Sequence, residues 1–334
     1  MNTRELLDPE ILPVLDLYPD VELTRDQVPL LREQAKEQLV LEDPAAYDVD
    51  RTEVAVSSAD SESTPVRCLL YVPSNPVPNN SVPSHNGSLT DAPQNPPAAL
   101  RSAYLHLHGG GYLYGAPDMS DLHNLILSSM LKITILSVDY RLAPEHPIPA
   151  PLDDAYGALA WLHQNAAELR IDPQRIAVGG ESAGGGLAAA LAQRAVAAGE
   201  YSVCHQHLTY PMLDDRTGTQ QRPASSVTGQ FVWTRERNQF AWDCYLGDAA
   251  RAAPQVPARA EDLSGLPKCW MSTADLDLFR EENIAYSQAL MNAGVNCELV
   301  VYPGACHAFQ LMRDAAVSQR FFRDHLEALG RALS

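Results

Sequence analysis

The chain has 334 residues, with 42 acidic against 24 basic side chains and a formal net charge of −18. A chain of this length buries roughly three quarters of the surface that it exposes when unfolded, so it needs no disulfide or metal to hold a core. The acidic balance argues against nucleic acid and anionic lipid as partners, because like charges repel.

The sequence carries no signal for a membrane span, a secretion leader or a metal site. No apolar run approaches the roughly 18 residues that a transmembrane helix needs. Residues 1–10 are polar and acidic, so we expect a cytoplasmic protein. The six cysteines form no C-x-x-C pair and are predicted to be reduced core residues. His205 and His207 alternate along a predicted strand without convincing partner ligands, so neither a metal nor another cofactor is expected.

The first quarter of the chain reads as a helical segment, two strands and a loop. Residues 1–45 have apolar positions at helical spacing, and Pro44 is expected to end this segment. Alternating apolar runs at 52–57 and 66–72 predict two strands. The stretch 74–97 is rich in proline and asparagine, which excludes a helix or a central strand, so we interpret it as a long surface loop.

From residue 101 onwards, predicted strands alternate with predicted helices. The strands are expected at 102–107, 133–138, 175–178, 207–210, 268–272 and 298–301, and the helices at 153–164, 188–198, 281–292 and 317–329. Parallel strands need long crossover connections, which helices usually provide. The alternation therefore predicts an α/β protein with a mostly parallel central sheet covered by helices on both faces.

The stretch 217–246 interrupts this alternation and is rich in aromatic residues. The sequence leaves two interpretations open, an extra helix packed on the core or a lid that walls a binding pocket. In the lid interpretation, Phe231 and Trp233 are candidate substrate-binding residues, together with Tyr112 further upstream.

A G-x-S-x-G motif, formed by Gly180, Ser182 and Gly184, lies between a predicted strand and a predicted helix. Small flanking residues let the backbone turn sharply and expose the serine at the top of the turn. The motif alone arises often by chance, but the strand–turn–helix context is what a nucleophilic serine requires. Ser182 is therefore the candidate nucleophile.

A second glycine-rich loop, His108-Gly-Gly-Gly-Tyr112, follows the predicted strand at 102–107. Three glycines leave backbone N–H groups unshielded, so a substrate oxyanion can approach them closely. A phosphate-binding loop is the alternative, but no Gly-Lys-Ser/Thr follows. The predicted oxyanion-hole donors are the amides of Gly110, Gly111 and Ala183.

A serine nucleophile needs a histidine base, and the base needs an acid that fixes its tautomer. In this class of site the chain order is serine, acid, histidine. Of the ten histidines, His307 follows a predicted strand and a Pro-Gly turn, whereas His325 falls in a predicted helix and is expected on the surface. The acid should follow the predicted strand at 268–272, where Asp275 and Asp277 both qualify.

These motifs together resemble the hormone-sensitive-lipase-like family of α/β-hydrolases, which are bacterial carboxylesterases. Residues 108–112 match the family's HGGG motif, and residues 181–185 match its D-S-A-G-G turn with glutamate in place of aspartate. The run 138–147, VDYRLAPEHP, matches a family stretch nearly letter for letter and is the most specific part of the likeness. The likeness extends from Tyr104 to His325.

The resemblance separates the two candidate acids. In the family the catalytic aspartate begins a D-P-L-R-D-E sequence, and Asp277 rather than Asp275 fits that register, although the two residues after it depart from the pattern. The family's histidine loop matches residues 303–309 around His307. The resemblance thus implies a triad of Ser182, Asp277 and His307.

The resemblance also implies how the chain is divided. The α/β-hydrolase core is expected at 46–211 and 251–334, with a helical cap made from 1–45 and 212–250. The loop at 74–97 is then an insertion in the core.

The expected function is that of a serine carboxylesterase that hydrolyses short- to medium-chain esters through an acyl-enzyme intermediate. The same residues could serve an amidase, a lactonase or a thioesterase. A ligand-binding protein on an inactive hydrolase scaffold is a further alternative, disfavoured because such proteins have lost the histidine that His307 supplies here. The expected partner is a small-molecule ester. Because of the negative net charge, we expect anionic esters to bind poorly unless the pocket is locally neutral. Edge-strand dimers are common in the family, which leaves a homodimer open.

Overall fold

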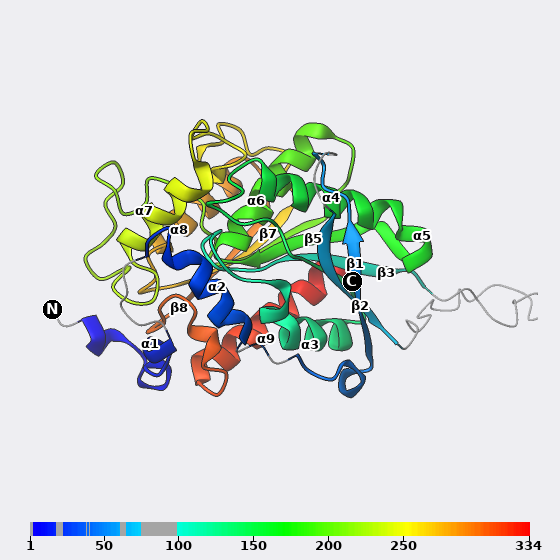
Figure 1. The fold of residues 1–334 in the computed structure, drawn as a ribbon, viewed down its shortest axis with the longest axis horizontal. Coiled ribbons are helices and arrows are strands. Elements are labelled where there is room, and N and C mark those ends of the chain that lie inside the picture. Colours follow the sequence, from blue (N-terminus) through cyan, green and yellow to red (C-terminus); the bar gives the residue numbers. More distant parts are fainter. Residues whose placement is uncertain (1–2, 18–22, 38, 40, 61–64, 75–98) are drawn as a thin grey trace, which may run out of the picture.

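The computed structural model describes residues 3–17, 23–37, 39, 41–60, 65–74 and 99–334 (Figure 1). Apart from Ser74, the surface loop predicted at 74–97 lies outside these described residues. Both glycine motifs and the late histidines belong to residues 99–334, which are described without a break.

An eight-stranded sheet forms the centre of the described structure, in the order β1-β2-β4-β3-β5-β6-β7-β8. β2 pairs antiparallel with β1 and with β4, and all other neighbours pair in parallel. The strands are β1 Val49–Val56, β2 Val66–Pro73, β3 Arg101–Leu107, β4 Thr134–Val138, β5 Ile171–Glu181, β6 His205–Thr209, β7 Lys268–Ala274 and β8 Cys297–Tyr302. This sheet confirms the predicted α/β class.

Helices cover both faces of the sheet, with α4, α6 and α8 on one face and α3 and α9 on the other (Figure 1). Their bounds are α3 Asp121–Leu131, α4 Ala150–Gln164, α6 Ala183–Ala198, α8 Arg280–Asn292 and α9 Ala316–Leu333. The remaining helices are α1 Val14–Leu17, α2 Gln27–Glu37, α5 Ala166–Leu169 and α7 Arg235–Leu246, with 3-10 turns η1 Thr3–Leu6, η2 Pro9–Ile11, η3 Pro44–Tyr47, η4 Pro117–Ser120, η5 Pro257–Arg259 and η6 Phe309–Leu311. No helix of the described residues is long and apolar enough to cross a membrane.

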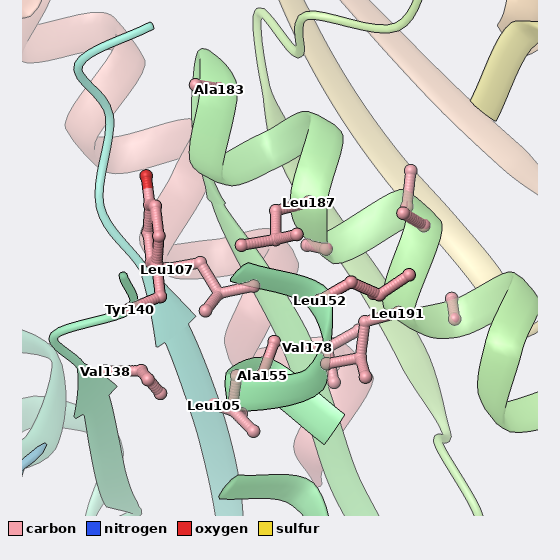
Figure 2. Close-up of a cluster of buried hydrophobic side chains, with 14 of the residues drawn as sticks. Leu105, Leu107, Val138, Tyr140, Leu152, Ala155, Val178, Ala183, Leu187 and Leu191 are labelled. Carbon is pink, nitrogen blue, oxygen red and sulfur yellow. The ribbon is translucent and has the colours of Figure 1, made fainter. Parts of the chain in front are cut away.

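The core beneath α6 fixes that helix against the sheet (Figure 2). Leu187 and Leu191 of α6 are fully buried, as are Leu105 and Leu107 of β3. Burying one leucine side chain contributes about 1.5–3 kcal/mol, so these four residues hold the helix firmly. The first residue of α6 is Ala183, which follows Ser182 directly, so this packing also sets the position of the candidate nucleophile.

The N-terminal segment differs from the prediction of a helical segment ending at Pro44. The described part of residues 1–45 holds short 3-10 turns and the helices α1 and α2. Pro44 begins η3 instead of ending a helix. The reason is local: Asp43 accepts a hydrogen bond from the Ala45 amide, and proline suits the first position of a helical turn because its missing N–H would be unpaired there.

His325 is a clear correction, because it was expected on the surface and is 1% exposed. It lies on the face of α9 that packs on the sheet, where its Nδ1 lies 3.1 Å from His207 Nε2. Two of the six cysteines also differ from the predicted core role, since Cys204 and Cys297 are only half-buried.

Candidate active site

The nucleophile turn is a strained backbone between β5 and α6. Ser182 has φ 57° and ψ −119°, in a region that residues with a Cβ rarely adopt. A Cβ on Gly180 would lie 1.9 Å from the carbonyl oxygen of Leu107, and one on Gly184 would lie 2.0 Å from the same atom. Both glycines of the G-x-S-x-G motif are therefore required for the turn to pack against β3.

The structure brings the three predicted triad residues within hydrogen-bond distance of one another. His307 Nε2 lies 2.9 Å from Ser182 Oγ, and His307 Nδ1 lies 2.7 Å from Asp277 Oδ2. Ser182 and His307 are each 5% exposed and Asp277 is 1% exposed. In this arrangement His307 can take the hydroxyl proton of Ser182 while Asp277 fixes the ring orientation.

The two candidate acids have different surroundings. Asp277 Oδ1 accepts a hydrogen bond from the Phe279 amide at 2.9 Å, which leaves Oδ2 aimed at His307. Asp275 is only half-buried, and its own amide donates to the Tyr302 carbonyl. Burial raises the pKa of Asp275, against the opposing effect of the Gly304 amide. Of the two candidate acids, only Asp277 has a described hydrogen bond with His307.

The three residues predicted to supply the oxyanion hole lie near Ser182 along the chain or at the same cavity. Gly110 and Gly111 have φ values of 124° and 61° and line the same cavity as Ser182. A Cβ on Gly111 would lie 2.2 Å from the Trp233 ring, so only glycine fits there. Ala183 is the first residue of α6, where an amide has no acceptor within the helix. Gly110 and Gly111 therefore lie at the cavity that Ser182 lines, and Ala183 directly follows Ser182 in the chain.

A cavity of about 160 Å³ opens at Ser182 and His307. Of the predicted substrate-binding residues, Trp233 lines it, whereas Tyr112 and Phe231 are not among its lining residues. Tyr112 is fully buried and stacks on Tyr245 with ring centroids 3.8 Å apart. The sequence did not indicate several other residues that line the cavity: Met119, His123, Glu181, Tyr210, Val232, Leu311, Arg313 and Phe322.

Tyr210 could have been found from the sequence. It directly follows β6, the strand next to β5, and the carboxyl ends of parallel strands meet at one edge of a sheet. Its ring lies 4.6 Å from the His307 ring, so it forms part of the wall beside the base.

A chain of four histidines runs from this cavity to the opposite end of the strands. His123 Nε2 lies 3.2 Å from His325 Nε2, His325 Nδ1 lies 3.1 Å from His207 Nε2, and His207 Nδ1 lies 3.4 Å from His205 Nε2. Burial lowers the pKa of His123 and of His205 to about 4, and it holds the pKa of His207 and of His325 well below the usual value. All four are therefore neutral at neutral pH. Within the described residues, no group of three or more His, Cys, Asp or Glu could hold a metal ion.

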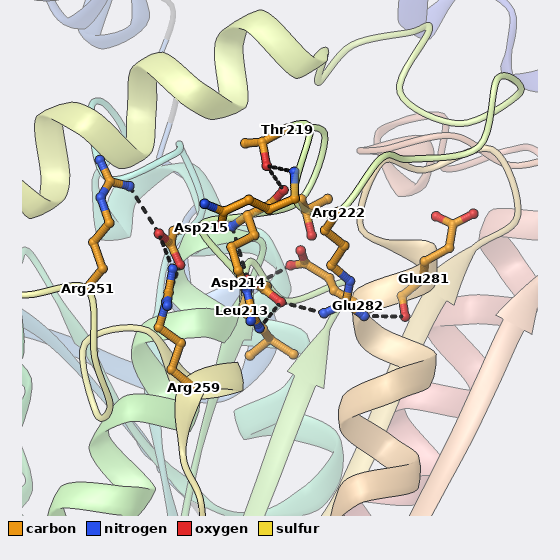
Figure 3. A network of polar contacts seen from close by, with 12 residues as sticks. Leu213, Asp214, Asp215, Thr219, Arg222, Arg251, Arg259, Glu281 and Glu282 are labelled. Atoms are coloured by element: carbon orange, nitrogen blue, oxygen red, sulfur yellow. Dashed lines mark hydrogen bonds and ion pairs between the residues drawn. The ribbon is translucent and has the colours of Figure 1, made fainter.

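A polar network fixes the segment after β6 to α8 (Figure 3). Asp214 is buried and accepts hydrogen bonds from Arg216 and Arg222. The Leu213 amide donates to Glu282 Oε1 on α8 at 2.7 Å. Since α8 begins three residues after Asp277, this network connects the segment after β6 to the helix that follows the loop of Asp277.

Comparisons with known proteins identify the family to which the chain belongs. The sequence profile of the α/β-hydrolase-fold family matches residues 104–311. Carboxylesterase NlhH of Mycobacterium tuberculosis is 35% identical over 236 residues, which cover 69% of this chain and 71% of the relative. Esterase LipI of the same organism is 30% identical over 304 residues, which cover 89% and 86%.

A solved structure, a bacterial heroin esterase, superimposes with a TM-score of 0.82 at 33% identity and covers both chains fully. The profile match covers more than half of the chain. The chain belongs to the α/β-hydrolase-fold family, in its hormone-sensitive-lipase-like group of bacterial carboxylesterases.

Proposed function

We infer that the chain is a serine carboxylesterase that hydrolyses short- to medium-chain esters. The observation that carries this inference is the hydrogen-bonded row Asp277–His307–Ser182 at the wall of a cavity, in a chain whose relatives are named carboxylesterases and esterases. The cavity, at about 160 Å³, is smaller than the roughly 300–1,000 Å³ typical of pockets for drug-sized ligands. Its size favours a short acyl group.

The proposed mechanism has two halves. Ser182 Oγ attacks the ester carbonyl as His307 Nε2 takes its proton, and Asp277 stabilises the resulting imidazolium. The amides of Gly110, Gly111 and Ala183 donate to the tetrahedral oxyanion. His307 then gives the proton to the leaving alcohol, and an acyl group remains on Ser182. Water, activated by His307, repeats the sequence and releases the acid.

We propose that α2 and residues 212–250 act as the cap over this cavity. Arg32 of α2 donates to the Leu113 carbonyl at 2.7 Å and to the Ala143 carbonyl at 2.6 Å, which ties α2 to the loops after β3 and β4. Val232 and Trp233 of the second segment line the cavity directly. The contacts of both segments lie at the carboxyl ends of the parallel strands, where Ser182 also lies.

Substitution of the nucleophile tests the proposal. Ser182→Ala is expected to lower kcat for p-nitrophenyl butyrate by about 10⁶, since a missing nucleophile removes the whole covalent route. Ser202→Ala is the matched control, because Ser202 lies before β6 and its hydroxyl contacts only the Pro173 carbonyl. Retention of substantial turnover by Ser182→Ala, with the control unchanged, would show that another residue performs the chemistry.

A further inference from the structure

The side chain of Glu181 is the feature of the cavity that the mechanism leaves unused. Glu181 is the last residue of β5 and directly precedes Ser182. It lines the cavity, and its side chain is 16% exposed. A carboxylate therefore lies beside the reacting atoms, partly open to the space that a substrate would fill.

Within the described residues, the carboxylate of Glu181 has one recorded hydrogen-bond partner. His106 Nε2 lies 3.1 and 3.3 Å from its two oxygens. The other ring nitrogen of His106 faces the Ser137 hydroxyl at 2.8 Å and the Asn124 Nδ2 donor at 3.4 Å, so it accepts and Nε2 carries the proton. One N–H leaves most of the acceptor capacity of a carboxylate unused.

Glu181 is ionised in this position. Burial on its own raises the pKa of the carboxyl, but the interactions with His106, including its hydrogen bond, outweigh burial and hold the pKa below its usual range. The other titratable groups near it do not cancel the charge at neutral pH. Burial lowers the pKa of His108 and of His123 to about 4, so both rings are neutral there.

The cavity has one opposing charge, on Arg313, at a more solvated place. Arg313 is exposed, and its guanidinium lies over the Phe322 ring, 5.3 Å from the centroid. Charges in water are screened within about 10 Å at ordinary salt, whereas a recessed carboxylate is screened much less. The deeper part of the cavity, next to Ser182, is therefore negative.

Aromatic rings complete the recognition chemistry. Trp233 and Tyr210 line the cavity close to His307, with ring centroids 6.2 and 4.6 Å from its ring. The face of an aromatic ring attracts a cation, and a carboxylate adds a full opposite charge. Anions are disfavoured by the same charge and by the net charge of −18.

We propose that Glu181 makes this site selective for esters that carry an ammonium group within a few atoms of the scissile carbonyl. This inference rests on the proposed esterase function and names its substrate class. The ammonium group lies against the Glu181 carboxylate and the Trp233 and Tyr210 rings, while the ester carbonyl lies at Ser182. Glu181 contributes to the binding of substrate and takes no part in the proton transfers.

Two pairs of esters of equal shape test the charge alone. Acetylcholine is compared with 3,3-dimethylbutyl acetate, and betaine ethyl ester with ethyl 3,3-dimethylbutanoate. The measured quantity is the ratio of kcat/KM for the cationic ester to that for its neutral partner. Glu181→Gln keeps the shape and the acceptor for His106, and it is expected to lower the ratio about 10-fold in at least one pair. The neutral esters are expected to change less than about 3-fold.

Glu168→Gln is the matched control, because Glu168 is an exposed residue of α5 and its loss changes the net charge equally. An unchanged ratio in Glu181→Gln, or an equal fall for both esters of each pair, would overturn the proposal and leave Glu181 a structural partner of His106. A fall in the ratio in Glu168→Gln would assign the effect to overall charge, which also overturns it.

A measurement on the unaltered protein tests the proposal even if the Glu181→Gln variant fails to fold. Choline is expected to inhibit the hydrolysis of p-nitrophenyl butyrate with an inhibition constant about 10-fold lower than that of 3,3-dimethylbutan-1-ol. Equal inhibition would contradict the proposal. Failure of the esterase function itself would look different, because the unaltered protein would then hydrolyse none of the neutral esters.

Discussion

Replacement of Asp277 by asparagine removes one charge while keeping the shape of the side chain, so it isolates how the acid holds His307. One oxygen of Asp277 faces His307 Nδ1 at 2.7 Å, and the other accepts from the Phe279 amide at 2.9 Å. Asparagine has a single oxygen, so it satisfies only one of these two N–H groups.

The two orientations of the new amide have different energies. With its oxygen toward His307, the NH2 group faces the Phe279 N–H and leaves a buried donor unpaired, which costs about 1–3 kcal/mol. With its oxygen toward Phe279, the NH2 group donates to His307 Nδ1 and drives the ring proton to Nε2. That tautomer cannot take the Ser182 proton. We expect the second orientation and a fall in kcat of about 10⁴, equal to about 5.5 kcal/mol of transition-state free energy.

The assay is kcat for p-nitrophenyl butyrate near neutral pH, with the thermal midpoint of each variant as the folding control. Asp275→Asn is the comparison, because Asp275 lies two residues away and contacts the loop before His307 through backbone amides. We expect Asp275→Asn to lose less than about tenfold. Equal losses in the two variants, or a tenth of the normal rate in Asp277→Asn, would refute the reasoning.

Two further predictions concern the turn and the buried histidines. Gly184→Ala is expected to lose about 1–3 kcal/mol of stability and most of its activity, because the new Cβ would lie 2.0 Å from the Leu107 carbonyl oxygen. In Gly199→Ala the new Cβ would have no atom within 4 Å, so the variant should keep its activity and lose only about 1 kcal/mol because of its φ of 67°. Equal activity in the two variants would contradict the packing argument. The lowered pKa of His325 means that the unfolded chain binds a proton that the folded chain does not, so stability falls as pH drops below about 6.5. His325→Gln should flatten this dependence by about 1 kcal/mol per pH unit in urea unfolding from pH 7 to 5, and an unchanged slope would show that His325 is not neutral in the fold.

The sequence predicted the alternation of strands and helices well, because parallel strands covered on both faces are short continuous apolar runs. It gave no prediction of α3, whose buried face includes the polar residues Asp121, Asn124 and Ser128. Polar side chains on the buried side break the apolar period on which helix prediction depends. Their hydrogen-bond partners are distant in the sequence, as in the bond that the Tyr71 hydroxyl donates to Asp121 at 2.9 Å. The residues next to α3 in the sequence therefore do not reveal these bonds.

In the candidate site too, local motifs indicate some residues, whereas others depend on contacts between distant parts of the chain. Ser182 and His307 were found from local motifs, since a nucleophile turn and a loop after a late strand have recognisable residues. The residues alone left Asp275 and Asp277 open, because both follow β7; the resemblance favoured Asp277, which is the acid in contact with His307. Tyr112 was expected to meet substrate but turns inward to stack on Tyr245, a contact between segments more than 130 residues apart.

Covalent labelling of the nucleophile tests the central claim most directly. The folded protein is incubated with a fluorophosphonate, and the modified residue is located by mass spectrometry of the digested chain. A serine activated by His307 is expected to give one adduct, on Ser182, with labelling lost after heat denaturation and in His307→Gln. Absence of the adduct under native conditions, or an adduct on another residue, would contradict the assignment of Ser182 as the nucleophile.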